Sequence, residues 1–280
     1  MNTDMMLFDL RKKNGVLLAA HRGVSGGNIP CNSLPAFQAA IRQKAEIVEL
    51  DADISEDGVL FVQHPGMEKV HLRMKDSVRN FSAETVKSFV LSNCDLVRTQ
   101  YHIPTLEEAL LLLRGRAVVN IDKFWEHPAE ISALVRRLGM EDQILIKSSP
   151  KPQYLDAVEE YAPDLAYMPI VSGENTIHDE LKARNVNYIG TEVLFSGEEM
   201  PVASKEYIDM MHGEGKLVWA NAIVYNYKSV LSAWHNDDVS VIGDPARGWG
   251  WLADRGFDII QTDFLYECRD YLVKSGRKTE

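Results

Sequence analysis

Residues 104–122 read PTLEEALLLLRGRAVVNID and contain the repeating unit from which the fold is predicted. The first part, which ends at Gly115, has the apolar spacing of an amphipathic helix and opens with Pro and Thr, as helices commonly do. The second part, AVVNID, is a short apolar run that predicts a buried strand. Such units, repeated along a chain, are typical of α/β proteins with a parallel sheet.

The same unit recurs along the whole chain. Eight apolar runs predict buried strands, at 16–20, 47–54, 117–122, 143–148, 165–171, 187–193, 216–222 and 258–263. Helix-like stretches lie between them, and several begin with Ser, Thr or Pro and end at Gly or Asn. This alternation predicts a (β/α)8 TIM-type barrel. An open doubly wound sheet is the alternative, and it is less favoured because no GxGxxG turn follows the first strand.

One segment interrupts the alternation. VLFVQ at 59–63 predicts an extra strand after the Asp57-Gly58 turn, and no further barrel strand is evident before the helix at 104. We therefore expect a small insertion at 65–103, after the second barrel strand, within a single domain that spans residues 1–280.

Composition excludes several classes of protein. The chain has 280 residues and a formal net charge of −11, so it lacks the basic face with which proteins bind nucleic acid. No run approaches the roughly 20 apolar residues of a membrane helix, so we expect no stable membrane insertion. The scattered Cys31, Cys94 and Cys268, and a start without a secretory signal, lead us to expect a cytoplasmic protein. The sequence does not indicate an oligomeric state.

Polar residues gather where the predicted barrel strands end. His21 and Arg22 follow the first strand, and Asp122 ends the third. Glu49 and Asp51 lie near the end of the second strand, where alternation places both carboxylates on one face. The C-terminal ends of the strands form the active site of a TIM barrel. Three carboxylates that converge there repel one another unless a cation holds them, and ligands that are all oxygen suit Mg²⁺ or Ca²⁺.

His64 follows the extra strand and is expected to reach the same place from the side. Two imidazoles, a divalent metal and an arginine supply the acid, base, Lewis acid and charge clamp that cleavage of a phosphodiester needs. Each residue also has a structural explanation: His21 as a surface group, His64 as a turn residue, Asp122 as a helix cap, and Glu49 and Asp51 as ion-pair partners of Arg22 or Lys147. The combination, rather than any single member, indicates a site.

These residues resemble the glycerophosphodiester phosphodiesterases, which are divalent-metal enzymes on a TIM-like barrel. The matching pieces are AHRG at 20–23, IPCNSLPAF at 29–37, VELDADISEDG at 48–58, QH at 63–64, IPTLEEAL at 103–110, NID at 120–122 and GFDIIQTD at 256–263. The resemblance extends from residue 16 to residue 272.

What the resemblance implies agrees with the interpretation of the residues. It implies a catalytic pair at His21 and His64 and a phosphate contact by Arg22. It implies one divalent cation held by the three acids, Glu49, Asp51 and Asp122. The implied substrate is a small-molecule glycerophosphodiester, which is cleaved to glycerol phosphate and an alcohol.

Three positions depart from the family pattern. Cys31 stands where the family usually has Glu, Pro65 follows the second histidine where Asp is usual, and Phe124 takes the place of a Lys beyond the third metal ligand. Lys123 is adjacent, but strand alternation predicts that it points away from the barrel axis. Lys147, at the end of the fourth strand, is a candidate for the missing phosphate-binding cation, with a surface lysine as the alternative.

Other residues are placed around or away from the site. Glu192 and Trp219, at the ends of the sixth and seventh strands, are expected to line the substrate pocket. The acids Asp237, Asp238 and Asp244 are interpreted as part of a solvated loop before the last helix.

Two other functions stay open at this point. The chain could bind a phosphorylated ligand without turning it over, because three positions depart from the family pattern. A phospholipase or a cyclic phosphodiesterase would use the same chemistry with another leaving group.

Overall fold

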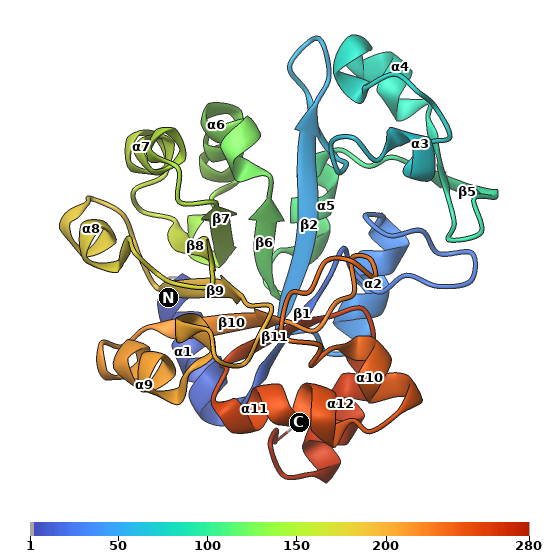
Figure 1. Ribbon diagram of the computed structural model, residues 1–280. Coiled ribbons are helices and arrows are strands. Elements are labelled where there is room, and N and C mark those ends of the chain that lie inside the picture. Colours follow the sequence, from blue (N-terminus) through green and yellow to red (C-terminus); the bar gives the residue numbers. More distant parts are fainter. Residues whose placement is uncertain (1–2, 280) are drawn as a thin grey trace.

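A closed parallel sheet forms the centre of the protein in the computed structural model, which describes residues 3–279 (Figure 1). The barrel strands in this range are β1 (Leu17–Ala20), β2 (Ile47–Ile54), β6 (Val118–Asp122), β7 (Ile144–Ser148), β8 (Ala166–Ser172), β9 (Gly190–Leu194), β10 (Leu217–Asn221) and β11 (Ile259–Thr262). Because β1 pairs in parallel with both β2 and β11, the sheet is closed. The predicted (β/α)8 barrel is confirmed, and each strand overlaps its predicted run.

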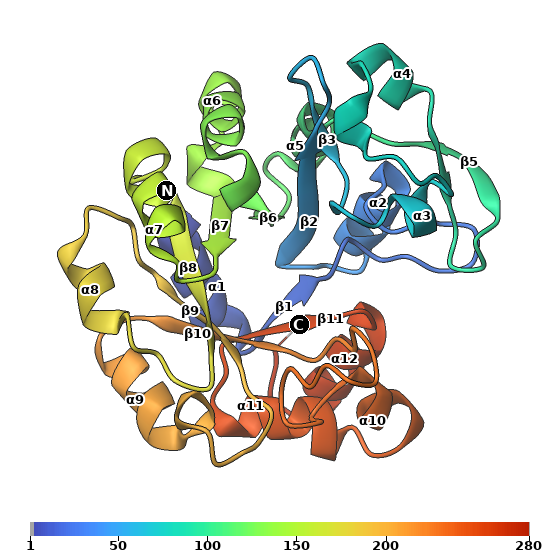
Figure 2. The same cartoon turned by 45° about the horizontal axis from the view of Figure 1, so that its top comes forward.

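Helices surround the barrel (Figure 2). They are α1 (Thr3–Asn14), α2 (Leu34–Arg42), α5 (Leu106–Leu113), α6 (Pro128–Leu138), α7 (Pro152–Tyr161), α8 (His178–Ala183), α9 (Lys205–Gly213), α10 (Asp237–Ile242), α11 (Trp251–Arg255) and α12 (Leu265–Lys274). Shorter turns are η2 (Phe124–Glu126), η3 (Glu141–Gln143), η4 (Pro201–Ala203) and the π-helical η5 (Ala246–Gly250). Helix α5 begins at a capping box formed by Thr105 and Glu108, as its opening residues predict. No helix within residues 3–279 combines the length and the apolar character needed to cross a bilayer.

Helix α1 closes the barrel at the end where the strands begin. Leu7 is fully buried against residues at the strand starts, among them Leu17, Ile47 and Val118. This helix is not evident from the sequence, because its apolar residues run together at 5–8 instead of recurring every three or four positions. Its single buried leucine nevertheless completes the interior layer of the barrel.

The segment 65–103 packs largely on itself. It contains α3 (Glu68–His71), η1 (Val78–Asn80), α4 (Ala83–Lys87) and the antiparallel strands β4 (Val90–Ser92) and β5 (Arg98–His102). Its apolar residues form a separate cluster with Phe61 of β3 (Leu60–Val62), the predicted extra strand, which pairs antiparallel with β2. In both views this segment lies at one edge of the barrel, beside β2 (Figures 1 and 2).

A buried carboxylate fastens this segment to the barrel. Asp53 of β2 is fully buried and accepts a hydrogen bond of 2.6 Å from Arg79 Nε in η1. His127 Nε2, which follows η2, lies 3.1 Å from the same oxygen. The strand that carries Glu49 and Asp51 therefore also anchors the segment 65–103.

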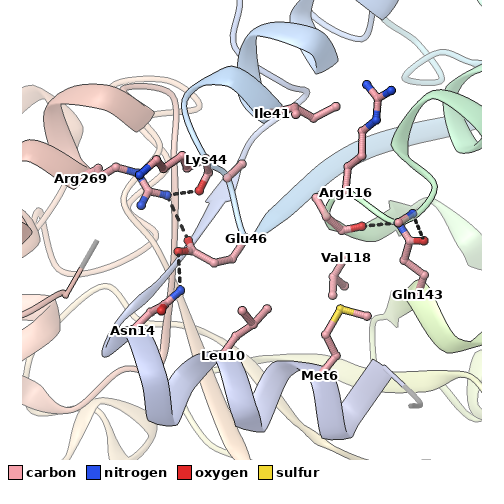
Figure 3. A pocket seen from close by; sticks show the side chains of 13 residues that line it. Met6, Leu10, Asn14, Ile41, Lys44, Glu46, Arg116, Val118, Gln143 and Arg269 are labelled. Carbon is pink, nitrogen blue, oxygen red and sulfur yellow. Dashed lines mark hydrogen bonds and ion pairs between the residues drawn. The ribbon is translucent and has the colours of Figure 1, made fainter.

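A second buried carboxylate holds the two ends of the chain together. Glu46, which precedes β2, lies 2.5 Å from Lys278 Nζ, and the Lys278 side chain is fully buried. Leu18 N–H donates to the same carboxylate at 3.0 Å. Arg269 Nη2 lies 3.4 Å from Glu46 Oε2, and both residues line a cavity of about 450 Å³ between α1 and the strand starts. Figure 3 shows the two side chains together at one side of this cavity.

We expect Glu46→Gln to lower the free energy of unfolding by about 3 kcal/mol, since loss of one partner leaves the ammonium of Lys278 buried without its counter-charge. Urea unfolding followed by circular dichroism measures this change. The control is Asp270→Asn, which removes the partner of the exposed Lys274 and should cost less than about 1 kcal/mol. Equal midpoints for wild type and Glu46→Gln would contradict the prediction.

Candidate active site

Three carboxylates meet at the C-terminal end of β2 and β6. Glu49 and Asp51 are separated by one residue on β2, and the register pairs Asp51 with Asp122 of β6. One oxygen from each of the three lies within 4.8 Å of the others. Glu49 is 3% exposed and Asp51 is fully buried, so water screens their repulsion poorly.

The electrostatics of the cluster reflect this crowding. Burial, followed by the nearby charge of Asp51, raises the pKa of Glu49 to about 7. Burial acts in the same direction on Asp51, but the positive charges of Arg22 and Lys123 outweigh it and lower the pKa of that carboxyl. Asp51 is therefore held ionised, whereas Glu49 gains its charge only near neutral pH unless another cation stabilises it.

The three acids fit a hard divalent cation. Within the described chain, Asp51 Oδ1 and Asp122 Oδ1 are buried and accept no hydrogen bond. Buried carboxylate oxygens normally have partners, and an unpartnered one is costly. A donor set composed only of carboxylate oxygens is the type that Mg²⁺ and Ca²⁺ prefer. The cluster is therefore a candidate metal centre.

Arg22 occupies a left-handed turn directly after β1. Its φ is +55°, its N–H donates to Glu49 at 2.7 Å, and its Nε lies 2.9 Å from Asp51 Oδ2. The next residue, Gly23, also has a positive φ, and a Cβ there would lie 2.8 Å from the backbone of Ala36. The HRG sequence thus allows a tight turn that brings both the backbone and the side chain of Arg22 onto the acids.

The two histidines lie at one cavity of about 420 Å³, and Arg22, Glu49 and Asp122 are among the charged residues that also line it. His21 Nδ1 lies 2.8 Å from Asp263 Oδ1. His64 Nδ1 lies 2.8 Å from the carbonyl oxygen of Pro65, and its Nε2 is 4.0 Å from Asp51 Oδ1. In both rings, therefore, Nδ1 is the nitrogen that is engaged with a neighbouring oxygen.

Lys123 lies in the site, contrary to the expectation from strand alternation. Its backbone is left-handed, with φ +62° and ψ +17°, so the alternation of β6 ends at Asp122. The ammonium group is ion-paired with Asp122 and lies 3.9 Å from Asp51 Oδ1. The side chain also lines the same cavity as the histidines. A single left-handed residue therefore brings a cation to the acids.

Lys147 has a different environment from the one expected for a phosphate ligand. Its side chain is 2% exposed, and its Nζ lies 2.6 Å from Glu192 Oε2 and 3.1 Å from the centroid of the Trp219 ring. It lines a small cavity of about 50 Å³ together with Glu49 and Asp122. Lys147 is therefore a buried partner of Glu192 at the floor of the site and is not a surface lysine.

Glu192 and Trp219 lie at different depths. Glu192 lines the large cavity and accepts a hydrogen bond of 2.7 Å from Asn221 Nδ2. Trp219 is fully buried in the interior layer and is absent from the described residues that line this cavity. The expectation that Trp219 is a pocket wall is wrong, because Asn221, two residues further along β10, takes the position that faces the cavity.

Several residues at the site were not singled out from the sequence. Asn32 Nδ2 donates to Asp51 at 2.7 Å, Gln261 lines the cavity, and Asp263 contacts His21. The opposite wall is apolar and comes from β8, β9 and the loop after β10: Ile170, Leu194, Ile223 and Leu231. The matching stretches IPCNSLPAF and GFDIIQTD contain Asn32, Gln261 and Asp263, so their presence in those motifs was the available signal.

The interpretation of residues 237–244 as a solvated loop is wrong for Asp237. This residue begins α10, is 1% exposed and accepts hydrogen bonds from Trp249 Nε1 and Thr262 Oγ1, both at 2.7 Å. Asp244 is exposed in the loop after α10, in agreement with that interpretation, whereas Asp238 is exposed but lies within α10. Polarity alone did not distinguish the buried acid from its two exposed neighbours.

Comparisons with known proteins point to one family. The model of the glycerophosphoryl diester phosphodiesterase family matches residues 21–265. A glycerophosphodiester phosphodiesterase of Bacillus altitudinis is 30% identical over 138 residues, which are 46% of this chain and 56% of that protein. Another, of Arabidopsis thaliana, is 34% identical over 101 residues, 35% of this chain and 30% of that protein. The chain thus spans about half the length, or less, of these curated relatives.

Solved structures show the same fold. A glycerophosphoryl diester phosphodiesterase of Parabacteroides distasonis superimposes with a TM-score of 0.77 at 19% identity, over 98% of this chain and 93% of that one. A phosphodiesterase of Oleispira antarctica, in complex with the product sn-glycerol-3-phosphate, has a TM-score of 0.64 at 17% identity, over 92% of this chain and 97% of that one. Together with the family match across most of its length, these findings show that the chain belongs to the glycerophosphoryl diester phosphodiesterase family.

Proposed function

We propose that the protein is a metal-dependent phosphodiester hydrolase that cleaves glycerophosphodiesters to glycerol phosphate and an alcohol. The observation that carries this proposal is the cavity at which His21 and His64 lie beside the cluster of Glu49, Asp51 and Asp122. Family membership supports the reaction class. The relative from Oleispira antarctica, solved with sn-glycerol-3-phosphate, supports the product.

In this proposal Glu49, Asp51 and Asp122 hold one divalent cation, Mg²⁺ or Ca²⁺. When bound, such an ion offsets negative charge on the phosphate oxygens and polarises the P–O bonds. This assignment is supported by Asp51 Oδ1 and Asp122 Oδ1, the two buried carboxylate oxygens that accept no hydrogen bond among the described residues.

The histidines carry the proton transfers. One imidazole takes a proton from the attacking water or from a neighbouring substrate hydroxyl, and the other gives a proton to the departing alkoxide. An imidazole suits both tasks because its ordinary pKa of about 6.5 lies near neutral pH. Nε2 of His21 and Nε2 of His64 are the atoms that perform these transfers, since both Nδ1 atoms are engaged.

Fixed positive charges hold the phosphate in place. Arg22 and Lys123 both line the cavity and lie beside the acids, so they are positioned to bind the non-bridging oxygens. We therefore assign to Lys123 the phosphate contact expected of Lys147. Lys147 balances the charge of Glu192 through an ion pair. Glu192 lines the cavity and accepts a hydrogen bond from a substrate hydroxyl.

The direct test of the proposal is incubation with glycerophosphocholine and either Mg²⁺ or Ca²⁺, with and without EDTA. Release of glycerol phosphate is expected with the metal and is expected to stop with the chelator, because the phosphate oxygens then lack the ion that offsets their charge. Release that EDTA does not affect would contradict the metal assignment. Thermal stabilisation by the phosphodiester without release would favour a barrel that only binds its ligand.

His21→Ala and His64→Ala are each expected to lower kcat by about 10²-fold or more, since each removes a proton-transfer group. Initial rates at saturating substrate and metal measure the change. His102→Ala is the control, because His102 is exposed on β5 of the segment 65–103 and should leave kcat unchanged. A variant with wild-type turnover would exclude that histidine as a catalyst.

Lys123→Ala is expected to lower kcat/KM by about 10- to 100-fold, the equivalent of one hydrogen bond to a charged group, worth about 1.5–3 kcal/mol. Lys151→Ala is the matched control, since Lys151 is exposed in the loop after β7. If Lys123→Ala keeps the wild-type kcat/KM, Lys123 does not bind the phosphate.

A further inference from the structure

The contact between His21 and Asp263 needs support from elsewhere. Asp263 follows β11, and its Oδ1 lies 2.8 Å from His21 Nδ1. Its side chain is 46% exposed. Exposed ion pairs of this kind add little to the stability of a protein, and a half-exposed carboxylate can adopt other rotamers in water. The position of Asp263 therefore depends on its backbone.

Asp237 fixes that backbone. Its Oδ2 accepts a hydrogen bond of 2.9 Å from Asp263 N–H, while its Oδ1 accepts from Trp249 Nε1 and Thr262 Oγ1, both at 2.7 Å. Its own N–H donates to the carbonyl oxygen of Ala222 at 2.7 Å. All three partners of the carboxylate are donors, so its ionised form can accept from all of them, although burial raises the pKa of Asp237 to about 6. The group is 1% exposed and water cannot replace these bonds.

The turn that carries Asp263 is also tied to the strand of His21. His21 N–H donates to the carbonyl oxygen of Thr262 at 3.2 Å, and Thr262 Oγ1 accepts from Phe264 N–H at 3.0 Å. The hydrogen bonds run from Trp249 through Asp237 and Asp263 to the imidazole of His21. An acid with a purely structural role would need only the hydrogen bond from Trp249. This series of hydrogen bonds instead continues to the imidazole of His21, which lines the cavity.

We propose that Asp263 is a positioning residue for His21, and that the buried Asp237 is a positioning residue for Asp263. Their contacts keep the ring proton of His21 on Nδ1, where it is donated to Asp263, and direct the unprotonated Nε2 at the cavity. A carboxylate at one ring nitrogen selects the tautomer in which that nitrogen carries the proton. The predicted effect on turnover rests on the proposed function, whereas the predicted tautomer of His21 does not depend on it.

The tautomer is measured in the intact protein by ¹⁵N NMR of the histidine rings, with the His21 signals assigned from His21→Gln. The wild type is expected to show His21 protonated at Nδ1. In Asp263→Ala, which leaves the buried bonds of Asp237 in place, the signals should move toward the Nε2-protonated form. Asp237→Asn should move them in the same direction, because an amide nitrogen must then face one of three donors. Asp238→Asn, on the neighbouring exposed residue, should change nothing.

Kinetics give a second readout. Asp263→Ala and Asp237→Asn are expected to lower kcat about 10- to 100-fold, the range found when outer partners of metal-binding histidines are removed, with KM unchanged. Although burial lowers it, Asp263 and Glu49 raise the pKa of His21 against the opposing charge of Arg22. Loss of Asp263 removes a group that favours the protonated ring, so the limb of the kcat profile that belongs to His21 should move to lower pH.

Trp249→Phe separates positioning from stability. It removes one hydrogen bond from Asp237 but leaves the bond to Asp263 N–H. It should lower the melting temperature without moving the His21 signals. If Asp237→Asn loses stability but keeps the wild-type His21 signals and kcat, Asp237 is only structural and the proposal is overturned. Unchanged signals in Asp263→Ala overturn it as well.

Failure of the proposed function gives a different pattern. If the wild type hydrolyses no glycerophosphodiester but Asp263→Ala and Asp237→Asn still change the His21 tautomer, the hydrolase assignment is wrong and the positioning stands. If hydrolysis occurs and the tautomer is unaffected by either variant, the positioning is wrong and the hydrolase stands.

Discussion

Mutual repulsion among three buried carboxylates is the constraint on which the site depends. Glu49, Asp51 and Asp122 have oxygens within 4.8 Å of one another, in a place where water screens charge poorly. Arg22 and Lys123 supply two positive charges, so three acids and two cations leave the group at −1. A bound divalent ion would bring it to +1, the sign that attracts a phosphodiester. Both cations come from residues with a left-handed backbone, and two oxygens of the acids still accept no hydrogen bond.

The barrel and the placement of the acids could be predicted from sequence because both follow from local periodicity. Buried parallel strands give continuous apolar runs, and the predicted run at 47–54 matches β2 residue for residue. Alternation along β2 correctly places Glu49 and Asp51 on one face, since the period of two holds as long as the strand continues.

The positions of Lys123, Asp237 and Trp219 depend on backbone conformation and on distant contacts, which the periodicity of the sequence does not encode. Lys123 leaves the strand pattern through one left-handed residue, and nothing in the letters NIDK marks that conformation. Asp237 is buried because donors from η5 and β11 reach it, whereas Asp238 beside it is exposed. The strand pattern predicts the direction of the Trp219 side chain but not its depth, and the cavity is lined two residues further along β10, by Asn221. Burial of a polar residue is decided by partners far away in the chain.

Strand β2 joins three parts of the molecule. Besides Glu49 and Asp51 it carries Asp53, whose bond to Arg79 fastens the segment 65–103, and it pairs with β3, after which His64 follows. A shift of this strand would therefore move the acids and the second histidine together. The segment 65–103 has its own apolar cluster, and it also meets the site directly, since Pro65 accepts the contact of His64 Nδ1 and Met67 N–H donates to the carbonyl oxygen of His64.

The buried ion pair between Glu46 and Lys278 has a practical consequence. Thr279 N–H also donates to the carbonyl oxygen of Asn14, so both ends of the described chain lie where the barrel strands begin, on the far side from His21. An affinity tag, a fluorescent label or a surface attachment placed at either end would therefore start from the closed base of the barrel and leave its open mouth accessible to substrate.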